Sequence, residues 1–311
     1  MRVPLLLAAL VLPALLLAAA PEASAAPVPV ETGVYLLNFG NFDVARGTYT
    51  MDLYLWFRWD PAAAPADFTP AAFELMNGRT TSRERILDHV APDGMRELWY
   101  RVQANLYTDP DFHDWPFDAQ RLPLAFEDAV LPAENLTYVP LGAASGVDPA
   151  VKVAGYRLAS FAQRTEAKAY PFDETYSRAV FELHVEREVL GTAVKTFLPP
   201  LVFMLVSGLG FLFPPEKLAL RVGAGTSMLI SAVMFHISQT ASLPPLGVLT
   251  LIDKIMISVY AFLALSLAIT AIISVNADYW KRPDLVPRLT RYGALATFAA
   301  PFVAFALIGG I

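Results

Sequence analysis

The residue types that carry enzymatic or metal chemistry are few and scattered in this chain. Its 311 residues include four histidines and no cysteine, which excludes zinc–thiolate sites, iron–sulfur clusters and cysteine nucleophiles. The histidines lack metal-ligand spacing, and no Gly-x-Ser-x-Gly, Walker or His-Glu-x-x-His pattern occurs. The carboxylate pairs Asp109/Asp111 and Glu127/Asp128 are at best weak calcium or proton sites. We therefore predict no catalytic residue, no metal and no cofactor.

The composition points instead to a protein that is partly embedded in lipid. Hydrophobic residues make up 55% of the chain and charged residues only 17%, whereas a soluble domain carries roughly 25% charged residues. The formal net charge of −6 argues against nucleic acid as a partner, because phosphate binding needs a basic surface. Between Thr196 and Val275 only five residues are charged, namely Glu216, Lys217, Arg221, Asp253 and Lys254.

Four apolar stretches follow residue 190, and each is about long enough to cross a bilayer as a helix. Short polar or proline-rich segments separate them. A soluble four-helix bundle would need charged outer faces, which these stretches lack. We predict a transmembrane domain over residues 191–311, with helices at about 196–213, 217–240, 250–275 and 289–309.

Residues 1–26 are typical of a signal peptide. A short positive start precedes an apolar run, and small residues at 23–26 offer a cleavage site. The alternative is a first membrane helix. A signal peptide places the mature amino terminus outside the cytoplasm.

Basic residues indicate the same orientation. Lys217 and Arg221 flank the first break between spans, and four more basic residues lie between 281 and 291, near the third break. Because basic residues gather on the cytoplasmic side, these two breaks are predicted to be cytoplasmic. We expect a multi-pass protein of the cell (inner) membrane, with its amino-terminal domain and its carboxyl terminus outside.

Residues 27–190 have the pattern of an all-β domain. Thr48–Trp59 alternates, with Met51 and Leu53 on one face and Asp52, Tyr54 and Trp56 on the other. Val180–Arg187 also alternates, with Phe181, Leu183 and Val185 facing inward and Glu182, His184 and Glu186 outward. Tyr100–Tyr107 and Leu122–Phe126 are further strand candidates. Short strands separated by turn signals predict an extracellular, immunoglobulin-like β-sandwich.

The segment Asp114-Trp-Pro-Phe-Asp-Ala-Gln-Arg-Leu122 resembles the signature of the pentameric ligand-gated ion channels, the Cys-loop receptor superfamily. Thr108 and Leu122 stand where that family has its bridging cysteines, so packing must hold the loop here, as in prokaryotic members. Arg187 lies twelve positions before Pro199, which matches the spacing of an arginine and a first-helix proline in the family. The resemblance covers nearly the whole mature chain.

The resemblance implies a junction that couples the sandwich to the pore. Arg187 shares the inward face of its strand, where a charge needs a partner, and the family pattern offers Asp118; the alternative is an arginine that snorkels to headgroups. The loop around Asp43–Gly47 is expected to touch the same junction. The predicted coupling residues are Trp115, Pro116, Phe117, Asp118, Arg187, Leu243, Pro244 and Pro245.

The second apolar stretch is the predicted pore helix. At 100° per residue, Glu216, Gly223, Ile230 and Ile237 fall on one stripe. Five copies would give a carboxylate ring that selects cations and apolar rings that form or flank the gate. The predicted pore-lining residues are Glu216, Ala219, Gly223, Thr226, Ser227, Ile230, Val233, Met234 and Ile237.

Two residues of this helix point elsewhere. Arg221 lies about 140° from Glu216, so the two cannot both line the pore, and a turned register would favour anions. His236 faces the other helices, where it is either a functional proton site or a histidine that donates to a backbone carbonyl.

The family binds agonists between neighbouring extracellular domains, in pockets lined by aromatic side chains. Aromatic rings suit an amine, and Glu127 or Asp128 is expected to add charge. The agonist itself is not identified by the sequence. The predicted ligand contacts are Tyr54, Arg58, Phe73, Asn77, Phe126, Glu127, Tyr170, Phe172 and Tyr176.

Taken together, these features predict a subunit of a homopentameric, cation-selective ligand-gated channel, opened by an agonist or by protons. The expected partners are four identical subunits, membrane lipid, permeating monovalent cations and a small agonist or proton, without nucleic acid. Two alternatives stay open. One is an anion-selective channel of the same family. The other is a non-conducting membrane sensor of the same architecture, which Gly223 and Gly225 in the pore helix would favour.

Overall fold

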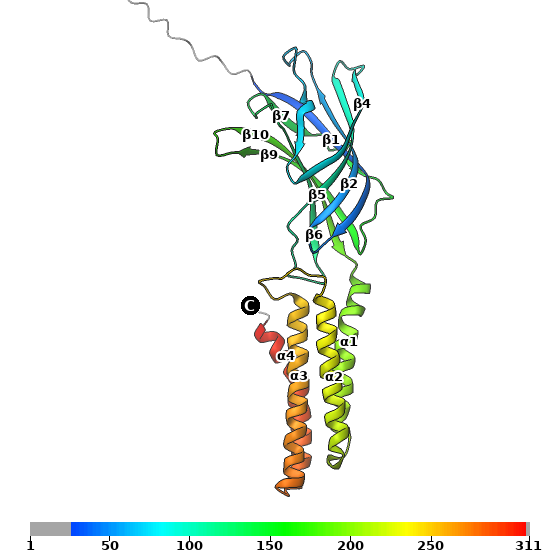
Figure 1. Ribbon diagram of the computed structural model, residues 1–311, viewed down its shortest axis with the longest axis vertical. Helices are drawn as coiled ribbons and strands as arrows, with labels where there is room; N and C mark the ends of the chain where they lie inside the picture. Colours follow the sequence, from blue (N-terminus) through cyan, green and yellow to red (C-terminus); the bar gives the residue numbers. More distant parts are fainter. Residues whose placement is uncertain (1–25, 309–311) are drawn as a thin grey trace, which may run out of the picture.

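The computed structural model describes residues 26–308, which form a β-sandwich above a bundle of long helices (Figure 1). The predicted fold class is confirmed in both of its parts. The predicted signal peptide, residues 1–26, falls outside the described residues except for its last position.

The sandwich consists of two sheets. In the larger sheet the strand order is β4-β5-β2-β1-β7, with β8 paired to β1, and in the smaller it is β3-β6-β10-β9. The strands are β1 (Val28–Asp43), β2 (Thr48–Trp59), β3 (Phe73–Leu75), β4 (Gly78–Val90), β5 (Arg96–Tyr107), β6 (Ala119–Asp128), β7 (Leu136–Pro140), β8 (Gly146–Val147), β9 (Tyr156–Ala169) and β10 (Thr175–Arg187).

The alternation of β2 and β10 places their apolar faces against each other. Leu53, Leu55 and Phe57 of β2 are buried in one core with Phe181 and Leu183 of β10. Side chains two residues apart lie on the same face of a strand, so the sequence pattern alone selects the core face. Burial of this apolar surface is the main force that holds the two sheets together.

Two residues that alternation assigned to the solvent face are buried instead. Trp56 is 4% exposed because its ring stacks on Trp99 of β5, with 4.6 Å between ring centroids. Glu182 is 7% exposed, and its carboxylate contacts the His184 ring nitrogen at 2.5 Å and the Arg164 guanidinium at 3.5 Å. Cross-strand and same-face partners on β5 and β9 cover both side chains, and such partners are not visible in a single strand.

Four helices in the described residues are long and apolar enough to cross a membrane. The first begins at Val189, two residues after the end of β10 at Arg187, and contains Pro199 and Pro200. A π-turn, Val275–Tyr279, follows the third helix. The helices are α1 (Val189–Leu209), α2 (Leu218–Thr240), α3 (Leu251–Ser274) and α4 (Val286–Ile308).

Small side chains bring α1, α2 and α3 close together. The hydroxyl of Ser207 in α1 donates to that of Ser266 in α3 at 3.3 Å. A Cβ added to Gly225 of α2 would lie 2.6 Å from a methyl group of Leu267 in α3. Small residues and interhelical hydroxyl bonds are the usual means by which helices associate in lipid. Gly225 therefore has a role in helix packing, and its presence in the pore helix does not by itself favour a non-conducting protein.

The helices alternate in direction, so the bundle has a sandwich end and a distal end. The turn between α1 and α2 and the turn between α3 and α4 lie at the distal end, and the loop between α2 and α3 lies against the sandwich (Figure 1). α3 starts at that loop with a capping box, in which the Thr250 hydroxyl accepts from the Asp253 amide at 3.3 Å and Asp253 accepts from the Thr250 amide at 2.8 Å. The chain is therefore a multi-pass membrane protein whose four spans follow its extracellular domain.

Gly33 of β1 provides a test of the packing around Trp56. A Cβ at position 33 would overlap the Trp56 indole, and overpacking of this kind costs about 1–3 kcal/mol. We expect Gly33→Ala to lower the free energy of unfolding by about that amount and to shift the tryptophan emission. The matched control is Gly146→Ala, because a Cβ at that strand glycine would meet Tyr35 only at an ordinary 3.8 Å. Equal stability of the two variants would contradict this packing.

Candidate functional site

The junction between sandwich and helices centres on a buried carboxylate and an arginine. Nε of Arg187, the last residue of β10, donates to Oδ1 of Asp118 at 2.7 Å. Asp118 is 1% exposed and the Arg187 side chain 17%. The inward-facing arginine of the sequence pattern therefore has its charge partner, and the alternative of an arginine that reaches to headgroups does not describe this geometry.

Two further residues complete the hydrogen bonds of this carboxylate. Oδ2 of Asp118 accepts from the Tyr156 hydroxyl at 2.6 Å and from the Gln120 amide at 2.7 Å. Arg187 Nη2 donates to the same Tyr156 oxygen at 2.6 Å. The guanidinium also lies 4.1 Å from the centroid of the Trp115 ring. A buried ion pair is stable only when its remaining donors and acceptors are satisfied, and these contacts supply that.

The loop that contains Asp118 is bound to the first turn of α3. The amides of Leu251 and Ile252 donate to the backbone carbonyls of His113 and Trp115, both at 3.1 Å. The first amides of a helix lack partners within the helix, so this loop satisfies donors that the helix leaves open. Movement of the loop is thereby linked to the start of α3.

Apolar contacts extend the junction to the other helices. Phe117 stacks on Phe197 of α1 at 5.9 Å between centroids. Trp115 packs in one cluster with Ile252 and with Leu243 of the α2–α3 loop, and Val44 of the β1–β2 loop packs against this cluster and against the sandwich core. Of the other predicted coupling residues, Pro116 is buried, Pro244 is half-buried and Pro245 is exposed.

Hydrogen bonds as well as packing hold the cysteine-free loop closed. Leu122 is fully buried, as expected for a residue held by packing. The Thr108 hydroxyl donates to the Arg121 carbonyl at 2.9 Å, and the Gln120 amide group bonds both the amide and the carbonyl of Asp111. No pattern in the sequence predicts these polar contacts.

One face of α2 is open in the single subunit, and it carries the residues predicted to line the pore. Ile230, Met234 and Ile237 are 65%, 61% and 57% exposed. The buried residues of α2 lie on the opposite side, at Arg221, Gly225 and Ala232. Every predicted pore-lining side chain is exposed, namely Glu216, Ala219, Gly223, Thr226, Ser227, Ile230, Val233, Met234 and Ile237.

Arg221 is turned away from this face. It is 4% exposed, and its Nε donates to the Phe213 carbonyl at 3.0 Å, with a second bond from Nη2 to the same oxygen. The carbonyl lies just before Pro214, in the turn between α1 and α2. The arginine thus binds the end of the preceding segment, and a register that exposes it to a pore would break both bonds.

Glu216 precedes the helix rather than opening it. It lies in a 3-10 turn, Pro215–Lys217, and α2 starts at Leu218. Pro214 and Pro215 have no amide hydrogen to donate and fix the local backbone, so the regular stripe drawn through Glu216 at 100° per residue does not hold at this position. The carboxylate is nevertheless exposed at the distal end of the bundle.

His236 joins α2 to α3. Its Nε2 lies 2.8 Å from Oδ1 of Asp253 and its Nδ1 3.1 Å from the Tyr260 hydroxyl. The other oxygen of Asp253 belongs to the capping box at Thr250. The histidine therefore contacts side chains of α3, and the alternative of a bond to a helix carbonyl does not apply to its ring.

The predicted ligand contacts fall into three groups, of which two lie at the surface of the sandwich and are half-buried for the most part, and the third lies largely within it. On the larger sheet, Tyr54 and Arg58 line a hollow of about 540 Å³ together with Tyr35, Trp56 and Trp99. Arg58 Nη1 donates to Glu31 at 2.7 Å, and Arg58 also pairs with Asp93 and, at 3.5 Å, with Glu97. Three carboxylates therefore neutralise the charge of this arginine.

The second group surrounds the β9–β10 loop on the smaller sheet. Tyr170 stacks on Phe172 at 5.1 Å and meets Tyr176 edge-on at 5.9 Å. The Tyr170 hydroxyl donates to Glu127 at 3.0 Å, and Arg178 Nε donates to the same carboxylate at 2.6 Å. Glu127 is thus already paired, which corrects the expectation that it offers a free charge to an amine.

The third group is structural. Phe73 is only 4% exposed and Phe126 is fully buried, both in the sandwich core. The Asn77 amide group bonds the Tyr49 hydroxyl, the Tyr107 and Pro123 carbonyls and the Ala125 amide. The order of these three residues along the chain matches the ligand-binding loops of the family, but order does not determine the face of a strand. We remove them from the ligand contacts.

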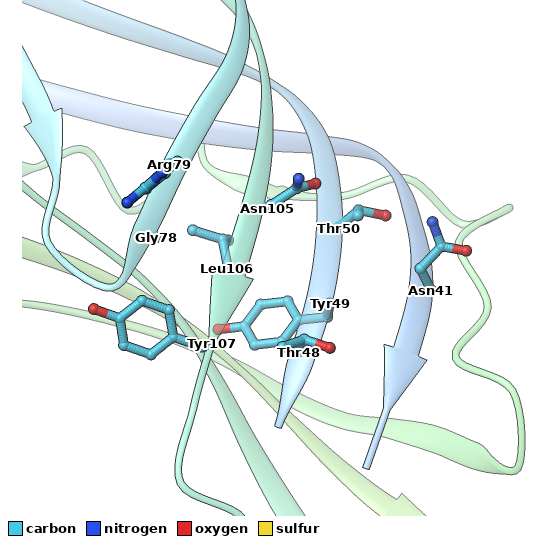
Figure 2. Close-up of a pocket in the computed structure, with 9 residues that line it drawn as sticks. All are labelled: Asn41, Thr48, Tyr49, Thr50, Gly78, Arg79, Asn105, Leu106 and Tyr107. Carbon is cyan, nitrogen blue, oxygen red and sulfur yellow. The ribbon is translucent and has the colours of Figure 1, made fainter. Parts of the chain in front are cut away.

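A further hollow, of about 450 Å³, is lined by residues of the larger sheet, and no pattern in the sequence predicts it. Figure 2 shows side chains from four strands around it, including Asn41 of β1, Thr50 of β2, Arg79 of β4 and Asn105 of β5. It is separate from the Tyr54 hollow in its lining residues.

Comparison with known proteins finds relatives that are channels or receptor subunits. The chain is 22% identical to a proton-gated ion channel of Gloeobacter violaceus over 84% of this chain and 76% of that protein. It is 22% identical to the gamma-aminobutyric acid receptor subunit rho-3 of Homo sapiens, over 75% of this chain and 55% of the subunit. A pH-sensitive chloride channel of Anopheles gambiae is 25% identical over 53% of this chain and 28% of that protein.

These matches cover the relatives unequally. The chain spans about three quarters of the bacterial protein and about half of the human subunit. No family model matches the chain.

Asp128, next to the Glu127 pair, gives a pH-dependent prediction. It is 1% exposed, its Oδ1 accepts from the Val130 and Leu131 amides, and its Oδ2 has no hydrogen-bond partner among the described residues. Burial raises the pKa of Asp128 above its usual range, against the effect of the two amide bonds. The folded protein therefore holds this proton more tightly than the unfolded chain.

The sign of the effect follows from that difference. The stabilisation is fully present below the unfolded pKa of about 3.9 and is lost as pH rises through the higher folded value. We expect Asp128→Asn to gain thermal stability relative to wild type as pH rises from acid to neutral, measured by thermal unfolding of the purified protein. Asp109→Asn, at an exposed carboxylate, is the control. Parallel pH profiles for wild type and Asp128→Asn would refute the assignment.

Proposed function

We propose that this chain, a member of the pentameric ligand-gated ion channel family, assembles as five copies that form a cation-selective channel of the cell membrane. A ligand or a proton at the extracellular domain opens it. The family forms pentamers that conduct ions, and the relatives of this chain include a proton-gated channel and a chloride channel. The charge of the permeating ion therefore depends on the residues that this chain presents to the pore.

The observation that carries the proposal is the division of α2 into an exposed and a buried face. Glu216, the hydroxyl residues Thr226 and Ser227 and the apolar residues from Ile230 onward are exposed, whereas Arg221 is buried and bonded to Phe213. The Thr226 hydroxyl donates to the Val222 carbonyl at 2.8 Å, which leaves its oxygen free to accept. Around a central axis, this face offers cations carboxylate and hydroxyl oxygens and an apolar constriction that can close by dewetting.

The ligand site in this proposal lies between neighbouring subunits. The Tyr170, Phe172 and Tyr176 rings lie on the smaller sheet, and the hollow with Tyr54 and Trp56 lies on the larger one. Neither surface is enclosed by one chain. Apposition of one subunit's β9–β10 loop with the next subunit's hollow supplies aromatic walls on both sides, and such walls suit an organic cation.

In this proposal the conformational change passes from the sandwich to the helices through the junction. The Arg187–Asp118 pair holds the end of β10 to the signature loop, which is bonded to the first turn of α3 and packed against the α2–α3 loop. We place the boundary between extracellular and membrane domains at Glu188, between β10 and α1. A ligand shifts the closed–open equilibrium only if it binds the open arrangement more tightly.

Substitution of Glu216, which would form the carboxylate ring, tests the proposed cation selectivity. In wild-type channels opened by an acid step, tenfold dilution of external sodium chloride is expected to shift the reversal potential negatively, toward the limit of about −59 mV for one monovalent cation. Glu216→Gln is expected to move that shift toward zero, because the inner mouth loses five negative charges.

Glu134→Gln, at an exposed carboxylate of the sandwich, is the matched control and is expected to keep the wild-type shift. A positive shift in wild type would establish anion selectivity instead. A shift of the reversal potential in Glu216→Gln equal to that of wild type would show that the Glu216 carboxylates do not set ion selectivity.

A further inference from the structure

The apolar part of the open face of α2 contains one side chain that can be altered chemically. Ile230, Met234 and Ile237 are 65%, 61% and 57% exposed, and residues three or four apart share one side of a helix. At a rise of 1.5 Å per residue, Met234 lies about 6 Å from Ile230 and about 4.5 Å from Ile237 along the axis. The thioether of Met234 therefore stands within the apolar constriction of the proposed channel.

Met234 also differs from the other methionines in its exposure. Two of them, Met51 and Met256, are buried, and four are half-buried, namely Met76, Met95, Met204 and Met228. Among the methionines of residues 26–308, Met234 alone has an exposed side chain. Because oxidation of sulfur follows access to solvent, an oxidant dissolved in water reaches this thioether before the others.

Met228 provides an internal comparison on the same helix. It lies six residues before Met234 and packs against the buried cluster that contains Ile252 and Met256 of α3. The two methionines therefore belong to one helix and differ in the face they occupy, so that a difference in their reactivity reports which face of α2 meets water.

The reaction that fits an exposed thioether is transfer of one oxygen atom from a peroxide. With hydrogen peroxide, a lone pair of the sulfur attacks one peroxide oxygen, the S–O bond forms and the O–O bond breaks. The second oxygen leaves as water after it takes up the proton of the first. The sulfur is oxidised by two electrons and the peroxide is reduced by two, so the step needs no further reactant.

Oxidation would replace an apolar group by a hydrogen-bond acceptor. Ser238 lies four residues after Met234 and is exposed, so its hydroxyl is on the same side of α2 and can donate to a sulfoxide oxygen. Water can donate in the same way. Closure by dewetting requires an apolar constriction, and five sulfoxides between the rings of Ile230 and Ile237 would interrupt it.

We propose that Met234 is a redox-sensitive site of the pore, at which a peroxide oxidises the thioether to the sulfoxide and the oxidised ring keeps the constriction hydrated and conducting. The inference rests on the proposed function, because it requires that the open face of α2 lines a channel. It adds a chemical control of the pore that is separate from the extracellular ligand.

The reactivity of Met234 is tested without any current. The purified full-length protein is reconstituted in lipid nanodiscs and treated with dilute hydrogen peroxide, and peptide mass spectrometry follows the gain of about 16 Da at each methionine. We expect Met234 to be oxidised roughly tenfold faster than Met228. Equal rates would overturn the proposal, because Met234 would then be as shielded as a packed side chain.

The effect on the pore is tested by the residual current at a pH that does not open the channel, recorded before and after peroxide. We expect this current to rise roughly fivefold in wild type. The matched control, Met228→Leu, is expected to show the same rise. Met234→Leu is expected to show none relative to its own starting current, because leucine is apolar and carries no sulfur. Met234→Gln is expected to raise the residual current without peroxide.

Two outcomes of the current measurement would overturn the proposal. One is an unchanged residual current in a conducting wild-type protein whose Met234 is shown by mass to be oxidised. The other is a rise in Met234→Leu equal to that of wild type. Failure of the proposed function gives a different result, in which no current flows before or after peroxide. The effect on conduction then falls with the function, while the ratio of oxidation rates still decides the site.

Discussion

The contact on which the rest of the structure depends is the buried pair of Asp118 and Arg187. Arg187 ends β10 and α1 begins two residues later, so the position of this arginine fixes where the first span leaves the sandwich. Its partner Asp118 belongs to the loop whose carbonyls receive the first two amides of α3. One ion pair therefore sets the relation of a strand, a loop and two helices. Its cost in desolvation is offset by Tyr156, Gln120 and the Trp115 ring.

The membrane domain follows a second constraint, which is the division of each helix into faces. In α2 the glycine and alanine at 225 and 232 pack inward together with Arg221, and the hydroxyls and branched apolar side chains remain open. A single subunit leaves this face and much of α1 and α4 without protein contacts, which is the arrangement expected of a subunit that completes its packing with lipid and with copies of itself. Ion selectivity in the proposed channel depends on this same division, because it decides which charge meets the pore.

Much of the architecture could be predicted from local patterns. Alternation in β2 and β10 identified the core face, the apolar stretches indicated four spans, and the inward position of Arg187 required a partner. Partners that depend on strand register across the sheets, such as Tyr156 and Gln120, could not be predicted, because neither is near Arg187 in sequence. The burial of Phe126 follows from its parity with Leu122 and Leu124, whereas its order along the chain does not indicate which face of the strand it occupies. The 3-10 turn at Glu216 follows from two prolines whose effect a regular helical projection ignores.

Amide hydrogen exchange at single-residue resolution tests most directly whether the ion pair holds the sandwich to α3. The Leu251 and Ile252 amides donate to the signature loop, whereas the Asp253 amide is held by Thr250 within its own helix. In the purified protein, Arg187→Gln is predicted to accelerate exchange at Leu251 and Ile252 and to leave Asp253 unchanged. Unchanged exchange at all three amides in a folded Arg187→Gln protein would contradict the account, because the loop would then stay on α3 without the pair.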